Sequence, residues 1–179
     1  MTSFFSYEEL SKIGFKSYGQ NVLISKKVSI YSPEKISIGN NVRIDDFCIL
    51  SGNITIGSNI HISAFCALYG ANGIIMRDFS GMSPRCTIFS ATDDFGGDFL
   101  IGPIHSSDLT NVTGGNVILD SYVQLGACTT VMPNLTIGEG AITGTNTLVR
   151  KSLEPWTINI GIPSHILRER KKGLLNKIY

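Results

Sequence analysis

An aliphatic residue recurs at every sixth position through most of the chain, and this period constrains the fold more than any other feature. It matches neither the period of an α-helix nor the simple alternation of an ordinary strand. It is typical of a solenoid, in which each short unit stacks on the one before it. The series run through Ile24, Ile30 and Ile36, then Ile38, Ile44, Leu50, Ile56, Ile62, Leu68 and Ile74, then Met76, Met82 and Ile88, and finally Leu119, Leu125, Val131, Ile137, Thr143 and Val149.

A glycine often follows the aliphatic residue, as at Gly39 and Gly57. We interpret each unit as a short flat strand and a corner, where the missing side chain relieves crowding of the backbone. Three units close a triangular coil, so successive coils pair as parallel strands around a buried aliphatic stack. Cys48 and Cys66 are one coil apart, and Cys86 follows after a two-residue slip. These three cysteines are therefore expected to stack as small apolar fillers.

The composition is that of a globular chain, with 42% hydrophobic and 16% charged residues. A net charge of +1 provides no overall field for nucleic acid, so we expect no such partner. No apolar run is long enough to cross a bilayer, and the N-terminus lacks the basic and apolar regions of a signal peptide. We therefore expect a cytoplasmic protein without membrane insertion, in which Cys128 and the other three cysteines are free thiols.

The sequence predicts one domain, residues 1–179, with a cap at each end of a β-helix spanning 22–154. Residues 1–20 form the N-terminal cap, and a capping box at Ser6 and Glu9 predicts a short helix there. Residues 163–177 are predicted to form a C-terminal α-helix with an apolar stripe and a basic face.

The repeat is absent from residues 90–116, which concentrate acids, glycines and His105. A long loop inside a compact repeat protein is usually functional. We therefore expect the chemistry of this protein to involve the inserted segment.

The hexapeptides over residues 22–154 resemble the left-handed β-helix acyltransferases. The resemblance implies an all-β fold, a left-handed parallel β-helix of hexapeptide repeats with a long inserted loop. It further implies a homotrimer with active sites between neighbouring subunits. It also implies a role in the synthesis of a bacterial surface polysaccharide such as O-antigen.

The C-terminal coils are similar to the galactoside and maltose acetyltransferase branch, whose donor is acetyl-CoA. The matching elements are Leu125-Gly126-Ala127, Gly144-Thr145, Val149-Arg150-Lys151 and Gly161-Ile162-Pro163. The resemblance implies that the Ala127 N–H faces the thioester oxygen. It also implies that Lys151 and Arg168 meet the cofactor phosphates, with His165 where the branch often has an arginine. The implied cofactor site comprises Gly126, Ala127, Gly144, Thr145, Lys151, Pro163, His165 and Arg168. An ordinary charge at the end of a coil is the alternative for Lys151.

The inserted segment resembles the dTDP-4-amino-4,6-dideoxyglucose acetyltransferases, through residues 90–97, Gly102-Pro103 and Asn111-Val112-Thr113. Where the maltose branch has a histidine base, this chain has Asp93 and Asp94, and where relatives often have a histidine after N-V-T it has Gly114. We therefore take Asp94 and Asp93 as candidate catalytic residues, followed by His105. A carboxylate can orient an ammonium and accept its proton, which favours an amine acceptor. A turn-capping pair is the alternative for the two aspartates.

The resulting hypothesis is an acetyl-CoA-dependent acetyltransferase that N-acetylates a nucleotide-linked amino-deoxy sugar. The alternative is an O-acetyltransferase acting on a hexose or another hydroxyl acceptor. A carbonic anhydrase of the same fold would need three zinc-binding histidines, and His61, His105 and His165 lack the expected spacing, so no metal is expected. An ice-binding or scaffolding helix would leave the polar inserted segment unexplained.

Overall fold

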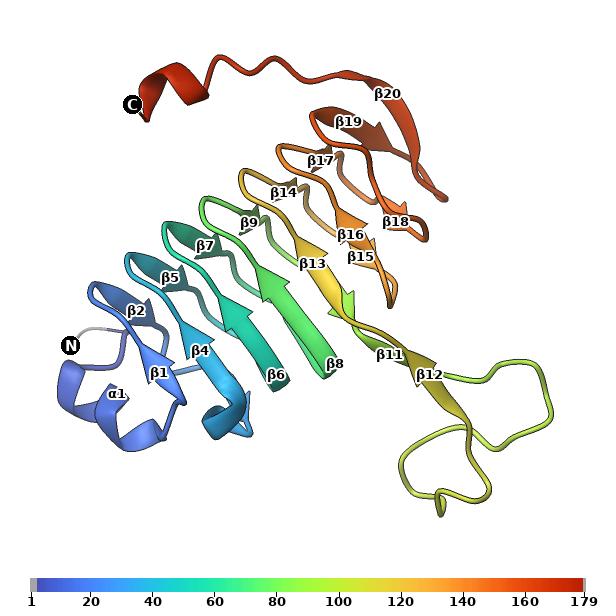
Figure 1. Ribbon diagram of the computed structural model, residues 1–179. Helices are drawn as coiled ribbons and strands as arrows, with labels where there is room; N and C mark the ends of the chain where they lie inside the picture. The colour runs from blue at the N-terminus through green and yellow to red at the C-terminus, as the bar shows by residue number, and fades with distance from the viewer. Residues whose placement is uncertain (1–2, 179) are drawn as a thin grey trace.

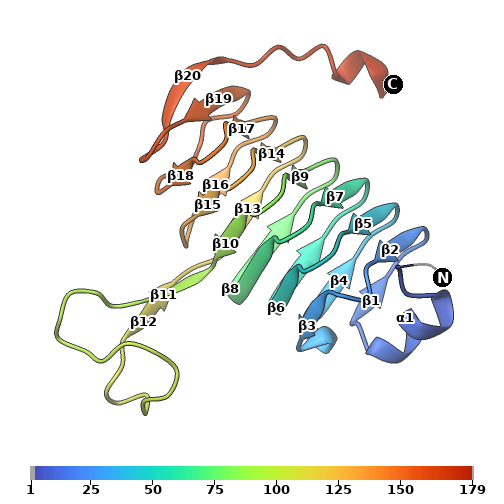
Figure 2. The same ribbon diagram turned by 180° about the vertical axis from the view of Figure 1, so that it is seen from behind.

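The computed structural model describes residues 3–178, which coil into a parallel β-helix with three flat faces (Figures 1 and 2). The first face contains β1 (Ser17–Tyr18), β4 (Ile36–Ile38), the second halves of β6 (Ile49–Ile56) and β8 (Ala67–Met76), β13 (Val117–Leu119) and β16 (Thr136–Ile137). The second contains β2 (Val22–Ile24), β5 (Val42–Ile44), β7 (Ile60–Ile62), β9 (Gly81–Met82), β14 (Gln124–Leu125), β17 (Ile142–Thr143) and β19 (Thr157–Ile160). The third contains β3 (Ser29–Tyr31), the first halves of β6 and β8, β10 (Thr87–Phe89), β15 (Thr130–Val131) and β18 (Leu148–Val149).

The strand register confirms the coil predicted from the period of six. Ile44 pairs with Ile62, and Leu50 pairs with Leu68, so residues of the same series lie one above the other. These side chains are fully buried. The strands therefore enclose one continuous aliphatic core, as expected from the repeat.

The corners confirm the role given to the glycines. A Cβ added at Gly39 would lie 2.6 Å from the Gly57 carbonyl oxygen, closer than real Cβ atoms approach a backbone. Successive coils therefore stack closely at these corners because the side chain is missing.

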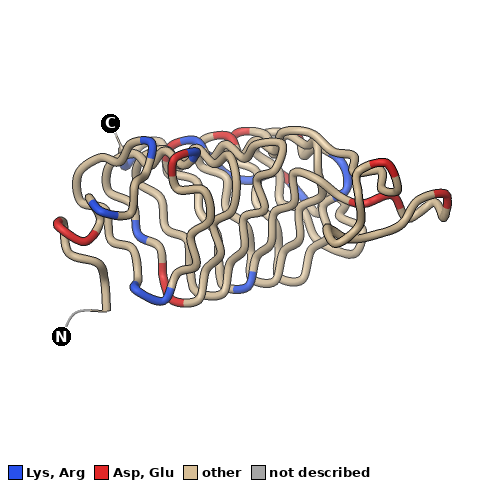
Figure 3. Tube along the Cα trace, turned by 90° about the horizontal axis from the view of Figure 1, so that it is seen from below, with Lys and Arg blue, Asp and Glu red and all other residues tan. Residues whose placement is uncertain are grey.

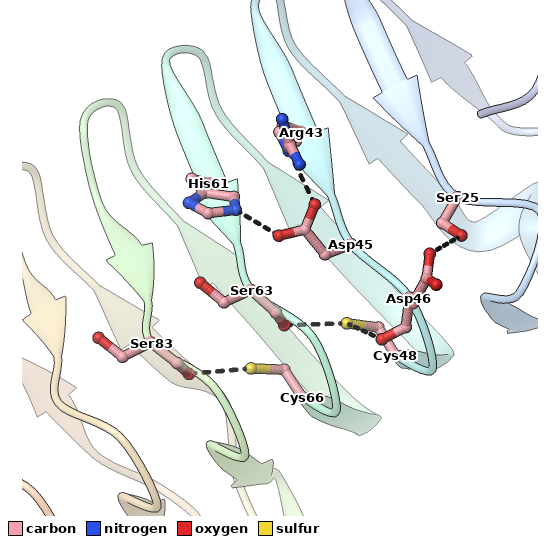
Figure 4. A network of polar contacts seen from close by, with 9 residues as sticks. All are labelled: Ser25, Arg43, Asp45, Asp46, Cys48, His61, Ser63, Cys66 and Ser83. Carbon is pink, nitrogen blue, oxygen red and sulfur yellow. Dashed lines mark hydrogen bonds and ion pairs between the residues drawn. The ribbon is translucent and has the colours of Figure 1, made fainter. Parts of the chain in front are cut away.

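The three stacked cysteines also lie as predicted. Cys48, Cys66 and Cys86 are buried free thiols, each near a backbone carbonyl of the next coil: Cys48 Sγ lies 3.1 Å from the Ser63 oxygen, and Cys66 Sγ lies 3.1 Å from the Ser83 oxygen (Figure 4). The neighbouring Cys66 thiol, and then burial, raise the pKa of Cys48 above its usual value. A neutral, hydrogen-bonded thiol suits a structural filler of the core.

The N-terminal helix is present as α1 (Tyr7–Ile13). Its capping box is complete, because Ser6 Oγ accepts from the Glu9 N–H at 3.2 Å and Glu9 Oε2 accepts from the Ser6 N–H at 2.7 Å. Leu10 inserts into the aliphatic core. The coil extends beyond the predicted limits, because β1 and β19 add paired strands at its two ends.

The predicted C-terminal α-helix over 163–177 is wrong. Residues His165–Glu169 form β20, which pairs antiparallel with β19, and only η2 (Leu175–Lys177), a 3-10 turn, is helical. The last coil would otherwise leave the edge of β19 unpaired, and a returning strand satisfies its backbone groups. Ile166 and Leu167 stay exposed, so the apolar stripe that suggested a helix covers no core. Among the described residues, no helix is long and apolar enough to span a membrane.

Candidate active site

Between β10 and β13 the chain leaves the coil as an arm, residues 90–116, which projects from the corner between the third and first faces (Figures 1 and 2). The base of the arm is an antiparallel ladder of β11 (Ala91–Asp93) and β12 (Val112–Gly114). The buried Ser90 hydroxyl fastens this base to the coil, donating to the Tyr69 carbonyl at 3.0 Å and accepting from the Asn72 N–H at 2.8 Å. The predicted inserted loop is confirmed, and its hairpin base is an addition to the prediction.

The arm is acidic and carries exposed apolar side chains. It contains four aspartates and neither lysine nor arginine, and Figure 3 shows short red segments on the projecting part of the trace. Its exposed apolar residues are Phe95, Phe99, Leu100, Ile101, Ile104, Leu109 and Val112. A projecting segment with this surface is suited to contact with another polypeptide.

Asp94 directly follows β11, and both of its carboxylate oxygens are fixed. Oδ1 accepts from the Gly96 N–H at 2.6 Å, and Oδ2 accepts from Asn111 Nδ2 at 3.0 Å. These two hydrogen bonds, that of Gly96 first, hold the pKa of Asp94 below its usual value because they stabilise the charged form. The Gly96 bond is the turn-capping contact considered above. The carboxylate is ionised at neutral pH and partly open to solvent, so it can also attract an ammonium group.

The other two catalytic candidates are placed differently. Asp93 turns to the outer part of the arm, where its Oδ1 accepts from the Gly102 N–H at 3.3 Å. His105 is half-buried in that outer part, beyond the hairpin. Asp93 and Asp94 are adjacent in the sequence of the arm, but their carboxylates accept hydrogen bonds from different partners.

A second cluster lies on the corner between the second and third faces. Gly126 and Ala127 follow β14, and Gly144 and Thr145 occupy the same corner one coil later. The Ala127 carbonyl accepts from the Asn146 N–H at 2.8 Å, which ties the two coils together. A Cβ at Gly126 would lie 2.5 Å from the Thr143 carbonyl oxygen, so the close stacking of this corner needs glycine.

Two buried threonines support this corner from inside. The Gly126 N–H donates to Thr143 Oγ1 at 2.9 Å, and the Thr143 and Thr129 hydroxyl oxygens lie 2.8 Å apart. Thr129 Oγ1 is also 3.3 Å from the Gly144 carbonyl oxygen. Thr143 was predicted only as a member of the aliphatic series, and no role was predicted for the pair. The signal in the sequence for this contact was the presence of polar residues at two inward-facing positions of the repeat.

The last coil contains a cleft of about 300 Å³ lined by Arg150, Lys151, Pro163 and Ser164. The turn before Pro163, whose peptide bond with Ile162 is cis, is fastened to β18 through backbone hydrogen bonds of Leu148. The structure therefore brings Lys151 and Pro163, two residues of the implied cofactor site, to one cleft.

His165 begins β20 and lies against Gly161, where an added Cβ would stand 3.0 Å from the imidazole. Arg168 lies further along β20, opposite Ile158, and its Nη1 donates to the Glu169 carbonyl at 3.2 Å. Because this segment is a strand and not a helix, the two side chains are spread along an edge of the coil.

Arg170 has a structural contact that was not predicted from the sequence, since the residue was assigned to the charged face of a helix. Its Nη1 donates to the Tyr122 and Gly140 carbonyl oxygens, both at 2.8 Å, and its guanidinium lies over the Trp156 ring. Burial lowers its pKa from the ordinary value. Arg170 thereby holds the end of the returning strand against the corner between the first and second faces.

The three histidines lie on separate elements. His61 on β7 pairs through Nε2 with Asp45 Oδ2 at 2.7 Å, and Arg43 Nε holds the other oxygen at 2.7 Å (Figure 4). His105 is in the arm and His165 is on β20. Within residues 3–178, no group of three or more His, Cys, Asp or Glu side chains is arranged to hold a metal ion.

The two clusters are separated within one chain. Asp94 belongs to the arm at the corner between the third and first faces, whereas Gly126 and Ala127 lie across the third face, at its other corner. A reaction that uses both clusters therefore requires the arm of one chain to approach the corner of another, or a substrate that spans the face.

The chain is similar in sequence and fold to known acyltransferases. The chain is 39% identical over 170 residues to dTDP-4-amino-4,6-dideoxy-D-glucose acyltransferase of Escherichia coli, covering 93% of this chain and 88% of that protein. A variant of AntD, an N-acyltransferase of Bacillus cereus, solved with dTDP-4-amino-4,6-dideoxyglucose and coenzyme A, is 51% identical with a TM-score of 0.97, covering 99% of this chain and 96% of that one. A maltose O-acetyltransferase of Clostridium difficile shares the fold, with 20% identity and a TM-score of 0.54, over 93% of this chain and 78% of that one. No family model matches the chain.

The fold, the stacked glycine corner and these relatives define an acyltransferase built on a left-handed parallel β-helix of hexapeptide repeats. Within that class, the chain belongs to the family of dTDP-4-amino-4,6-dideoxyglucose acyltransferases.

Proposed function

We propose that this protein transfers an acetyl group from acetyl-CoA to the amino group of dTDP-4-amino-4,6-dideoxyglucose or a closely related nucleotide-linked amino sugar. The observation that carries the proposal is the Asp94 carboxylate, which is held ionised at the base of the arm. The proposal is supported by AntD, which was solved with this nucleotide sugar and coenzyme A, and also with dTDP and 3-hydroxybutyryl-CoA.

The donor side of the proposed site is the corner at Gly126 and Ala127. Among the described residues no acceptor faces the Ala127 N–H, so this donor is available to a thioester oxygen. A fixed backbone N–H stabilises the negative charge that develops on this oxygen as the amine adds. We assign the remaining coenzyme A contacts to Gly144, Thr145, Lys151, Pro163, His165 and Arg168, the cations among them serving the cofactor phosphates.

On the acceptor side, Asp94 attracts the sugar ammonium, which releases one proton to solvent, and the carboxylate then orients the neutral amine. The neutral amine attacks the thioester carbonyl carbon, so a C–N bond forms and the C–S bond breaks. The displaced coenzyme A thiolate takes up the proton that the nitrogen loses. Because hydrogen bonds lower the pKa of Asp94, its carboxylate is better suited to hold and orient the amine than to retain a proton.

We further propose that the active enzyme is a homotrimer in the cytoplasm, with each site formed between subunits. The proposal is supported by the separation of Asp94 from Ala127 within one chain, and by the exposed apolar side chains of the arm. The four free thiols agree with a reducing compartment.

The test is acyl transfer followed by mass spectrometry of the sugar product. We expect acetyl-CoA to add one acetyl group to dTDP-4-amino-4,6-dideoxyglucose and none to neutral hexosides. Mass detection avoids interference from the protein's own thiols. Acetylation of neutral hexosides alone would establish the O-acetyltransferase alternative and refute the proposal. A parallel reaction with 3-hydroxybutyryl-CoA measures which acyl group is preferred.

A further inference from the structure

Asn111 lies opposite Asp94 on the other leg of the arm. The ladder of β11 and β12 pairs Asp93 with Val112, and the next position continues it, because the Asp94 N–H donates to the Asn111 carbonyl at 3.0 Å. Opposite residues of an antiparallel pair present their side chains on the same face. This register places the Asn111 amide beside the Asp94 carboxylate, where Nδ2 donates to Oδ2 at 3.0 Å.

The two partners of the carboxylate have different origins. The Gly96 N–H binds Oδ1 from within the same turn, so it follows any movement of that turn. The Asn111 side chain is the contact that ties Oδ2 to the opposite leg, near the point where the arm joins the coil. Together they fix the plane of the carboxylate relative to the β-helix.

We propose that Asn111 is a positioning residue for the acyl-transfer reaction, which acts by setting the direction in which the Asp94 carboxylate meets the sugar amine. This inference rests on the proposed function. An amine must approach the thioester carbon within a narrow range of geometry, and a displacement of about 1 Å can lower the rate of a reaction about 100-fold. Asn111 itself needs no contact with the substrate.

The first test compares Asn111→Ala and the near-isosteric Asn111→Asp with the unaltered enzyme. We expect kcat to fall about 10- to 100-fold in both variants, with the KM for acetyl-CoA changed less than twofold. Thermal unfolding and coenzyme A binding control for folding of the arm and the coil. An unchanged kcat in a folded Asn111→Ala variant would overturn the proposal.

Titration of the Asp94 carboxyl separates positioning from a general structural role. The Asn111 bond stabilises the charged carboxylate, so its loss in Asn111→Ala raises the pKa of Asp94, which NMR titration of the substrate-free enzyme measures. The other titratable groups of the arm are Asp93, whose carboxylate accepts from the Gly102 N–H, and Asp98, His105 and Asp108, and all of them remain in this variant. An Asp94 pKa that stays in place while kcat falls would contradict the assigned role.

Gly96→Ala provides an independent perturbation from the other side of the carboxylate. Its Cβ would lie 2.8 Å from Asp94 Oδ1, so the carboxylate must move, while no polar group is removed. We expect kcat to fall several-fold, and Gly173→Ala, where a Cβ meets open space, serves as the matched control. Equal activity of the two glycine variants would count against a requirement for a fixed carboxylate.

Asp94→Asn distinguishes failure of this inference from failure of the proposed function. If Asp94→Asn is inactive and Asn111→Ala is fully active, only the positioning role fails. If Asp94→Asn retains full turnover, the role of Asp94 fails and the inference fails with it.

Discussion

The hydroxyl pair of Thr129 and Thr143 allows a double-mutant cycle on the corner that supports the proposed thioester site. Both side chains are almost completely buried, and they occupy positions that other coils fill with cysteine or aliphatic residues. Valine has nearly the same shape as threonine. Thr129→Val, Thr143→Val and the double variant therefore remove hydroxyl groups with little change in packing.

The expected magnitudes follow from the hydrogen bonds. Thr129→Val leaves the buried Thr143 hydroxyl without its Thr129 partner, which costs about 1–3 kcal/mol of unfolding free energy. Thr143→Val should cost less, because the Thr129 hydroxyl keeps the Gly144 carbonyl at 3.3 Å. In the double variant both hydroxyls are gone, and the Gly126 N–H retains the Thr143 carbonyl at 3.1 Å. Replacing both partners with apolar groups is close to neutral, so the double variant should be no less stable than Thr129→Val. We expect a coupling energy of at least about 1 kcal/mol.

The assay is urea unfolding at one fixed protein concentration, because any assembly of subunits makes the apparent stability depend on concentration. Two signals, far-ultraviolet circular dichroism and fluorescence, should give coincident transitions before free energies are compared. Additive losses, with the double variant as unstable as the sum of the two singles, would refute the account of a shared hydroxyl pair.

Three further changes test other parts of the structure. Gly126→Ala should unfold at a markedly lower temperature than the unaltered protein, because its Cβ meets the backbone of the next coil at 2.5 Å; a normal unfolding temperature would contradict this. Leu68→Ala should cost about 2–5 kcal/mol in urea unfolding, since it leaves a cavity in the buried stack, and a loss below about 1 kcal/mol would mean that the coil collapses around it. Lys151→Ala should raise the KM for acetyl-CoA several-fold at constant kcat, and it should weaken the dependence of this KM on salt concentration. An unchanged KM would make Lys151 an ordinary charge at the end of a coil.

The positions of the strands and the buried stack could be predicted from the sequence because a hexapeptide repeat is a local pattern with a single stacking solution. Leu50 and Leu68 are buried one above the other because three hexapeptides separate them, which is one turn of the coil. The capping box of Ser6 and Glu9 was predictable for the same reason, since its two hydrogen bonds join residues three apart. The cysteine column followed from the same arithmetic.

The C-terminal segment and the site depended on contacts between distant residues, which no local pattern encodes. Residues 165–169 have apolar spacing compatible with a helix, yet the unpaired edge of β19 makes them a strand. The fixed orientation of Asp94 depends on Asn111, which lies 17 positions away, and the support of Gly126 depends on Thr143, also 17 positions away. The sequence by itself determined the coil because its free energy comes from a repeated burial pattern. Only the tertiary structure decided which polar groups meet, since each such pairing depends on how the chain closes over the coil.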